Sequence, residues 1–238
     1  MRVPRASGHS CMSMSSTDKG LLTPQNCAVV FLDYQPQMFA AVSGRERHDL
    51  IESVLVLARA AKIFGVPVIF SVIQCKEFMG ELAPELMEQF PEEVLLKRTS
   101  MNAWDDARFV AAIKHTGRRN FLLAALWSEA CLVFTALQML EEGYGIYVVK
   151  DASRGTNRAV QDMALRRVEQ AGGVSLTALQ VLLEFQRDWA NSNHYDEVMA
   201  MVKPCCRLNN HGENHLLAGT AAEVPINPKL DQDRGPVI

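Results

Sequence analysis

The sequence predicts a single three-layer α/β/α domain, in which helices cover both faces of a doubly wound, mostly parallel sheet of about five to six strands. Short continuous apolar runs, typical of strands buried on both faces, alternate with segments whose apolar residues recur at helical spacing. The chain has 238 residues, of which 48% are hydrophobic and 21% charged, so one substantial core can form. The alternation of strand and helix implies right-handed crossovers and therefore a parallel sheet.

Each expected element follows from a local pattern. Cys27–Leu32 is a continuous apolar run that ends in Asp33, and Gly65 ends the first helical segment. The expected strands are residues 27–32, 66–72, 120–126, 146–149 and 174–176. The expected helices are residues 47–64, 102–115, 131–143, 157–170 and 178–190. Residues 74–101 are expected to form a long connection with a short helical piece at 84–89, and a loop of that length is usually functional.

The two ends of the chain differ from its middle. Residues 1–24 are polar and low in apolar periodicity, so they are expected to form a flexible tail ahead of a domain at 25–195. In residues 196–238 the periodicity fades, and we expect an extension that is poorly ordered or docked on a partner. The first twenty residues are rich in Ser, carry Arg2 and Arg5 and weakly resemble an organellar transit peptide.

Composition excludes several classes of function. The net charge of −3 gives no reason to expect nucleic acid or an anionic membrane as a partner. No apolar run approaches the ~20 residues that a membrane helix needs. Six cysteines are scattered without the spacing of a disulfide framework, which favours reduced thiols. The expected compartment is therefore the cytoplasm, with an organellar matrix as the alternative.

Three side chains are expected to converge at one edge of the sheet. Asp33 follows the first strand, Cys131 follows the strand at 120–126, and Lys97 lies in the long connection that should cover the same edge. Sites in doubly wound sheets form outside the carboxyl ends of strands, where strand order reverses. An acid, a cation and a thiol there form a coherent nucleophilic site, and a thiol at a strand-to-helix turn is expected to favour the thiolate. Alternatively, Asp33 caps a turn, Lys97 is a surface charge and Cys131 is part of the core.

Five segments in this order resemble the isochorismatase-like cysteine hydrolases, and most closely their YcaC-type branch. Asp33 followed by Gln35 is similar to the family's first strand end, Asn102–Asp105 is typical of the branch, and Ser128-x-x-Cys131 matches the Thr-x-x-Cys box of the family. The resemblance extends over about residues 24–192. The segments are Val30–Gln35, Lys97–Asp105, Ser128–Leu132, residues 142–153 and Arg187–Trp189.

The resemblance implies a catalytic triad of Asp33, Lys97 and Cys131, in which Cys131 attacks a carbonyl and forms a thioester that water hydrolyses. It also implies a cis peptide bond between Leu126 and Trp127, which aims the N–H groups of Trp127 and Cys131 at the developing oxyanion. A small-molecule substrate and a homo-oligomer are the expected partners. Gln35, Asn102 and Trp104 are the candidates to line the substrate pocket.

Trp127 departs from the small or β-branched residue expected beside the cis bond, and this leaves three functional alternatives open. The first is a cofactor-independent hydrolase of a small amide or related acyl compound. The second is a catalytically silent binding or scaffold protein, because a large indole could narrow the pocket. The third is a redox-sensing thiol protein. No metal is expected, because residues 74–79 contain no His and the adjacent Cys205 and Cys206 do not match zinc spacing.

Overall fold

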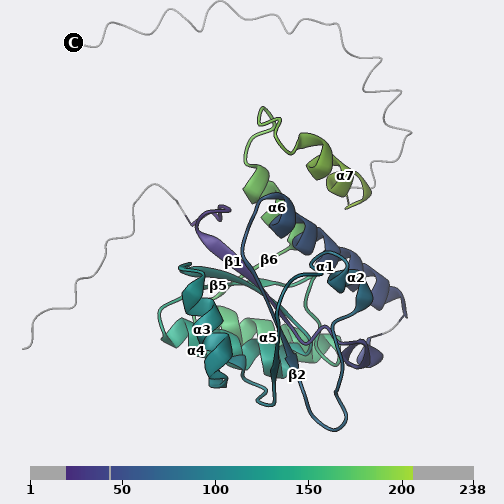
Figure 1. Ribbon diagram of the computed structural model, residues 1–238, viewed down its shortest axis with the longest axis vertical. Helices are drawn as coiled ribbons and strands as arrows, with labels where there is room; N and C mark the ends of the chain where they lie inside the picture. The colour runs from purple at the N-terminus through teal and green to yellow at the C-terminus, as the bar shows by residue number, and fades with distance from the viewer. Residues whose placement is uncertain (1–19, 43, 206–238) are drawn as a thin grey trace, which may run out of the picture. The chain divides into compact units, whose positions relative to one another are not determined.

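A computed structural model describes residues 20–42 and 44–205 (Figure 1). These residues form a six-stranded, wholly parallel sheet in the order β3-β2-β1-β4-β5-β6, so the expected doubly wound fold is confirmed. The apolar runs become strands because a parallel sheet is covered on both faces, and every residue of β1 is buried. The strands are β1 Cys27–Leu32, β2 Val68–Ile73, β3 Leu95–Arg98, β4 Asn120–Ala125, β5 Gly145–Val149 and β6 Val174–Leu176.

Helices form the two outer layers of the main unit. One layer contains α1 packed against α6 and α2, and the other contains α3, α4 and α5, whose apolar faces share a core with β1 and β4 (Figure 1). The α-helices are α1 Gly44–Ile63, α2 Pro84–Met87, α3 Ala107–His115, α4 Val133–Glu141, α5 Arg158–Gln170, α6 Ala178–Gln186 and α7 Tyr195–Cys205. Three short turns complete the set: the 3-10 turns η1 Pro36–Ala41 and η2 Ala103–Asp105, and the π-helical turn η3 Ser128–Leu132.

Several elements differ from the expectation. Strand β3 was not predicted, because four residues with two charges carry too little apolar pattern to stand out in a long connection. The expected helix at 131–143 is divided into η3 and α4, and the expected helix at 178–190 ends at Gln186 because Arg187 adopts a φ of 61°. Helix α7, also unpredicted, runs across the boundary between the main unit, which ends at Val198, and a second unit that starts at Met199.

Some expectations concern residues outside this description. The described residues do not include most of the tail at 1–24 or the part of the extension at 196–238 that follows residue 205. Cys206 and the histidines that follow it also lie outside the described residues. Within the described helices, none is long and apolar enough to span a membrane.

The strand order places the reversal of the sheet between β1 and β4. The chain builds outward from β1 to β2 and β3, then crosses back to lay β4 on the other side of β1. Leu32 and Ala125, the last residues of these two neighbouring strands, lie side by side in the parallel register. The segments that follow them, with Asp33 and Cys131, therefore leave the sheet next to each other at its carboxyl edge, where ligands bind in this class of fold.

Candidate functional site

Asp33 is a fully buried carboxylate at the carboxyl end of β1. Its backbone adopts a φ of 64°, an uncommon conformation that Asp tolerates better than most residues. The Asp33 N–H donates to the Ser71 carbonyl at 2.9 Å, and Oδ1 accepts the Ile73 N–H at 2.7 Å. These bonds to β2 hold the carboxyl group at the edge of the sheet.

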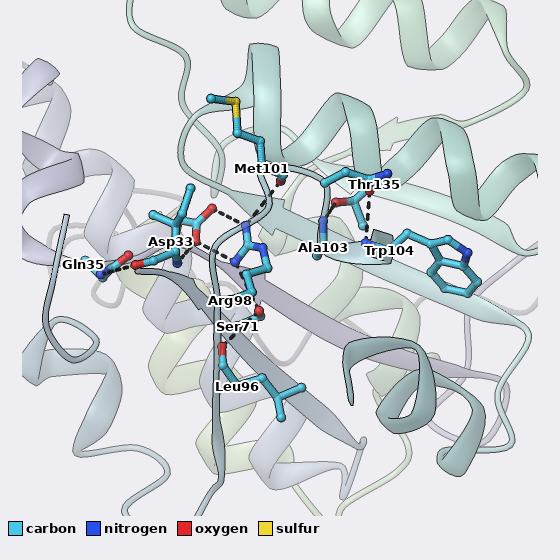
Figure 2. Close-up of polar contacts among 11 residues, drawn as sticks. Asp33, Gln35, Ser71, Leu96, Arg98, Met101, Ala103, Trp104 and Thr135 are labelled. Atoms are coloured by element: carbon cyan, nitrogen blue, oxygen red, sulfur yellow. Dashed lines mark hydrogen bonds and ion pairs between the residues drawn. The ribbon is translucent and has the colours of Figure 1, made fainter. Parts of the chain in front are cut away.

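Arg98, the last residue of β3, is the cation that meets this carboxylate (Figure 2). Its Nη1 lies 2.8 Å from Oδ1 of Asp33 and its Nη2 lies 2.7 Å from Oδ2, which is a bidentate ion pair. The side chains of both residues are at most 1% exposed. Nη1 also donates to Ser71 Oγ at 3.1 Å. Bidentate geometry is specific to the guanidinium group, so Arg98 fixes both the position and the orientation of the carboxylate.

Lys97, the cation expected in the triad, is not brought to Asp33. Its side chain is 48% exposed, and its Nζ pairs with Glu81 at 2.6 Å. Neighbouring side chains of a strand point to opposite sides, so when Arg98 turns inward Lys97 must turn outward. The register of β3 on β2 pairs Arg98 with Ile73, and this pairing determines which of the two cations faces Asp33. Period-two alternation across residues 95–98 was the only sequence signal that could have indicated Arg98.

Cys131 lies in the η3 turn, is 3% exposed and is a free thiol. Burial and then the negative charge and hydrogen bond of Asp33 raise the pKa of this thiol well above its ordinary value, while Arg98 and the Trp127 backbone oppose the rise. The expectation of a stabilised thiolate is therefore wrong. Desolvation and a neighbouring carboxylate outweigh the positive end of the helix. The Cys131 thiol nevertheless hydrogen-bonds Asp33, so these two residues lie together at this edge of the sheet.

The segment before Cys131 has the expected cis peptide bond between Leu126 and Trp127. The backbone of Arg154, which follows β5, brackets this bond: its N–H donates to the Ala125 carbonyl at 3.2 Å, and its carbonyl accepts the Ser128 N–H at 3.0 Å. The Trp127 backbone hydrogen-bonds the Cys131 sulfur. An N–H in this position fits the expected oxyanion donor, and that role remains a prediction.

Two of the three candidate pocket residues have side chains that make contacts other than with the Asp33–Arg98 pair. The Trp104 ring packs edge-on against Tyr144, with centroids 5.6 Å apart, and points away from the pair (Figure 2). Asn102 caps η2 by accepting the Trp104 N–H at 3.0 Å. Gln35 is different, because it is fully buried and its Nε2 donates to the Ile73 carbonyl at 3.0 Å. Its Oε1 has no hydrogen-bond partner among the described residues, so this buried oxygen is available to accept a hydrogen bond.

The fold and this cluster define an open parallel α/β domain with a buried acid, guanidinium and thiol at its switch point. The isochorismatase domain model matches residues 27–180, and the chain belongs to the isochorismatase family. It is 36% identical to the probable hydrolase YcaC of Escherichia coli, over 71% of this chain and 82% of that protein. The resemblance inferred from the five segments is thereby confirmed.

Two solved structures of YcaC proteins are similar to the whole domain. The Escherichia coli protein, described as an octameric hydrolase of unknown specificity, superposes with a TM-score of 0.75 at 32% identity, covering 83% of this chain and 98% of that one. The Pseudomonas aeruginosa protein, solved with hexane-2,5-diol and covalent acrylamide, has a TM-score of 0.71 at 32% identity and covers 81% and 95% of the two chains. Their similarity supports the fold and the family.

Proposed function

We propose that this protein is a cysteine-dependent hydrolase that cleaves a small amide or related acyl substrate through a thioester on Cys131. The observation that carries the proposal is the contact of the Cys131 thiol with Asp33, whose carboxylate is held by Arg98. A nucleophile beside a base, with the base oriented by a third group, is the arrangement typical of covalent catalysis. Arg98 takes the place that the resemblance assigned to Lys97.

The raised pKa of Cys131 determines how the first step proceeds. Because the resting thiol is neutral, Asp33 accepts the Sγ proton as the sulfur attacks the substrate carbonyl. The carbonyl oxygen becomes an oxyanion beside the N–H groups of Trp127 and Cys131. When the C–N bond breaks, the proton on Asp33 passes to the leaving amine and a thioester remains. Water, deprotonated by Asp33, then hydrolyses the thioester, and the thiol recovers its proton. Arg98 stays positively charged and paired with Asp33 throughout the reaction.

The experiment is a panel of small amides assayed for ammonia release, combined with acid quenching and intact mass. We expect one or more amides to be turned over and the quenched protein to carry the mass of the acyl group on Cys131. Cys131→Ala should abolish both signals, whereas Cys75→Ala, a control at a half-buried thiol, should leave both unchanged. Turnover that survives in Cys131→Ala would refute the proposed nucleophile.

A catalytically silent scaffold is the second candidate, and the burial of Cys131 with its raised pKa favours it. An inert cysteine in a protein core is also buried and also has a raised pKa. The same panel separates the candidates. The scaffold would hydrolyse no amide and would acquire no acyl mass.

We also propose that the chain forms a homo-oligomer, since the similar Escherichia coli YcaC is described as octameric. Light scattering after size exclusion should give several times the 26.5 kDa of one chain. A monomeric mass at micromolar concentration would contradict it. A small-molecule substrate is part of the same proposal, while the absence of nucleic-acid and membrane partners and the cytoplasmic location stay predictions.

A further inference from the structure

We propose that Trp127 and Phe78 form a fixed aromatic wall beside Cys131, which restricts this hydrolase to short, uncharged acyl groups. The inference rests on the proposed function and specifies its substrate class. It concerns the side chain of Trp127, which the proposed mechanism does not use.

The position of the wall follows from the backbone of Trp127. Trp127 is the N-cap of the η3 turn that contains Cys131, and its carbonyl accepts the Ala130 N–H at 3.2 Å. Its backbone also lowers the pKa of the Cys131 thiol through a hydrogen bond, and the N–Cα bond of a residue is only about 1.46 Å long. The indole therefore starts within a few ångströms of the reacting sulfur. An acyl group attached to that sulfur, with its oxygen on the Trp127 N–H, has the Trp127 side chain as its immediate neighbour.

The indole is held in place from two sides. Its Nε1 donates to the carbonyl of Met38 in η1 at 3.1 Å, and Met38 is buried. Phe78, in the loop after β2, meets the indole edge-on with ring centroids 5.7 Å apart and an interplanar angle of 87°. Turning the indole away would break both contacts and leave a buried carbonyl without its donor, so the wall does not yield to a long substrate.

The loop that carries Phe78 is itself tied to the loop after β1. Gln37 Nε2 donates to the Met79 carbonyl at 2.8 Å, and Gln35 Nε2 lies 3.4 Å from the Gly80 carbonyl. The Phe78 carbonyl accepts the Cys75 N–H at 3.0 Å. Three loops at the carboxyl edge, after β1, β2 and β4, thus support the same pair of rings. A wall built this way is rigid enough to discriminate by size.

Charge defines the other half of the substrate class. Asp33 and Arg98 are charged side chains that shift the pKa of the Cys131 thiol, and their buried ion pair cancels the two charges. Next to the sulfur, a charged acyl group would meet this ion pair, which leaves no net charge to pair with it. Burial of an unpaired charge is costly, so the site favours neutral acyl groups.

The test measures kcat/KM for a series of linear amides from acetamide to hexanamide in the wild type, Trp127→Ala, Trp127→Phe and Phe78→Leu. One methylene group in an apolar pocket changes selectivity by about 10–200-fold. We expect the wild type to favour the short amides, and Trp127→Ala to raise the ratio of hexanamide to acetamide by at least about tenfold. Trp127→Phe keeps the aromatic bulk and should keep the order of preference. An unchanged ratio in Trp127→Ala, with Phe78→Leu also unchanged, would overturn the wall.

A second arm compares succinamate with pentanamide, which has a similar length and no charge. We expect the wild type to process succinamate at least about tenfold less well, since the cation beside Cys131, Arg98, is already paired with Asp33. Equal rates would overturn the assignment of neutral substrates.

A third arm does not need turnover and separates this inference from the proposed function. The rates at which acrylamide and the bulkier cinnamamide modify Cys131 are measured by mass in each variant, with Cys131→Ala as the blank. We expect Trp127→Ala to raise the cinnamamide-to-acrylamide ratio by at least about tenfold. If that ratio rises but no amide is hydrolysed, the wall stands and the proposed hydrolase does not. If amides are hydrolysed but neither ratio moves, the hydrolase stands and the wall does not. If Cys131 is neither acylated nor modified, both are overturned.

Discussion

Arg98→Met is expected to destabilise the protein by about 3–5 kcal/mol, because it leaves the Asp33 carboxylate buried without its counter-charge. The carboxylate is fully buried and keeps only the Ile73 N–H as a donor from the described backbone. For a domain of this size that loss corresponds to a fall in Tm of roughly 10 °C. Thermal unfolding followed by circular dichroism, together with urea titration, measures the effect.

The neighbouring residue provides the matched control. Lys97→Met removes a cation of the same strand, but its partner Glu81 is 57% exposed, and such surface pairs contribute about 0–1 kcal/mol. The double variant Arg98→Met with Asp33→Asn removes both buried charges and should be more stable than Arg98→Met alone by about 1 kcal/mol or more. Equal destabilisation by the Lys97 and Arg98 substitutions would contradict the assignment of Arg98 as the buried partner.

Asp33→Asn is expected to change two reactions of Cys131 in opposite directions. Amide turnover should fall by about 10²–10⁴-fold, since the base that takes the thiol proton is lost. Alkylation by iodoacetamide should become faster, because the charge of Asp33 raises the pKa of Cys131 and its removal lowers that pKa again. Each unit of decrease raises the thiolate fraction about tenfold and lowers its nucleophilicity about threefold, a net gain of about threefold.

Alkylation is measured at pH 8 by peptide mass, with Cys75 as the internal reference and thermal unfolding as the check on folding. Asn tolerates the φ of 64° at this position, so the backbone conformation is retained. In the wild type, the rate at Cys131 should still be rising with pH above 9.0, the ordinary pKa of a thiol, because the folded protein holds the proton more tightly. Slower alkylation in Asp33→Asn would mean that Asp33 does not suppress the thiolate.

Residues 95–98 show why the cation of the site could not be predicted from the sequence. Two adjacent cations, Lys97 and Arg98, follow two leucines, and either could serve a carboxylate. Strand periodicity predicts that the two side chains lie on opposite sides of the strand, but it does not predict which one faces inward. The choice depends on pairing with β2, which is distant in sequence, and a short charged edge strand carries no pattern strong enough to predict that pairing.

The pKa of Cys131 was missed for a related reason. Its place at a strand-to-helix turn is readable from the sequence and favours a thiolate by itself. Burial depends on the packing of many segments, and it leaves Cys131 only 3% exposed, with its thiol next to a carboxylate. Trp104 is similar, since its proximity to Asn102 in sequence suggested a pocket, while packing against Tyr144 directs the ring away.

By itself, the sequence determined what depends on local pattern. The apolar runs and the alternation of strand and helix specified a doubly wound parallel sheet, and with it the meeting of Asp33 and Cys131 at the switch point. Only the tertiary structure decided which cation completes the site, how strongly Cys131 holds its proton and where Trp127 and Trp104 point. These properties arise from contacts between segments far apart along the chain, where register, burial and neighbouring charge act together and no local pattern encodes them.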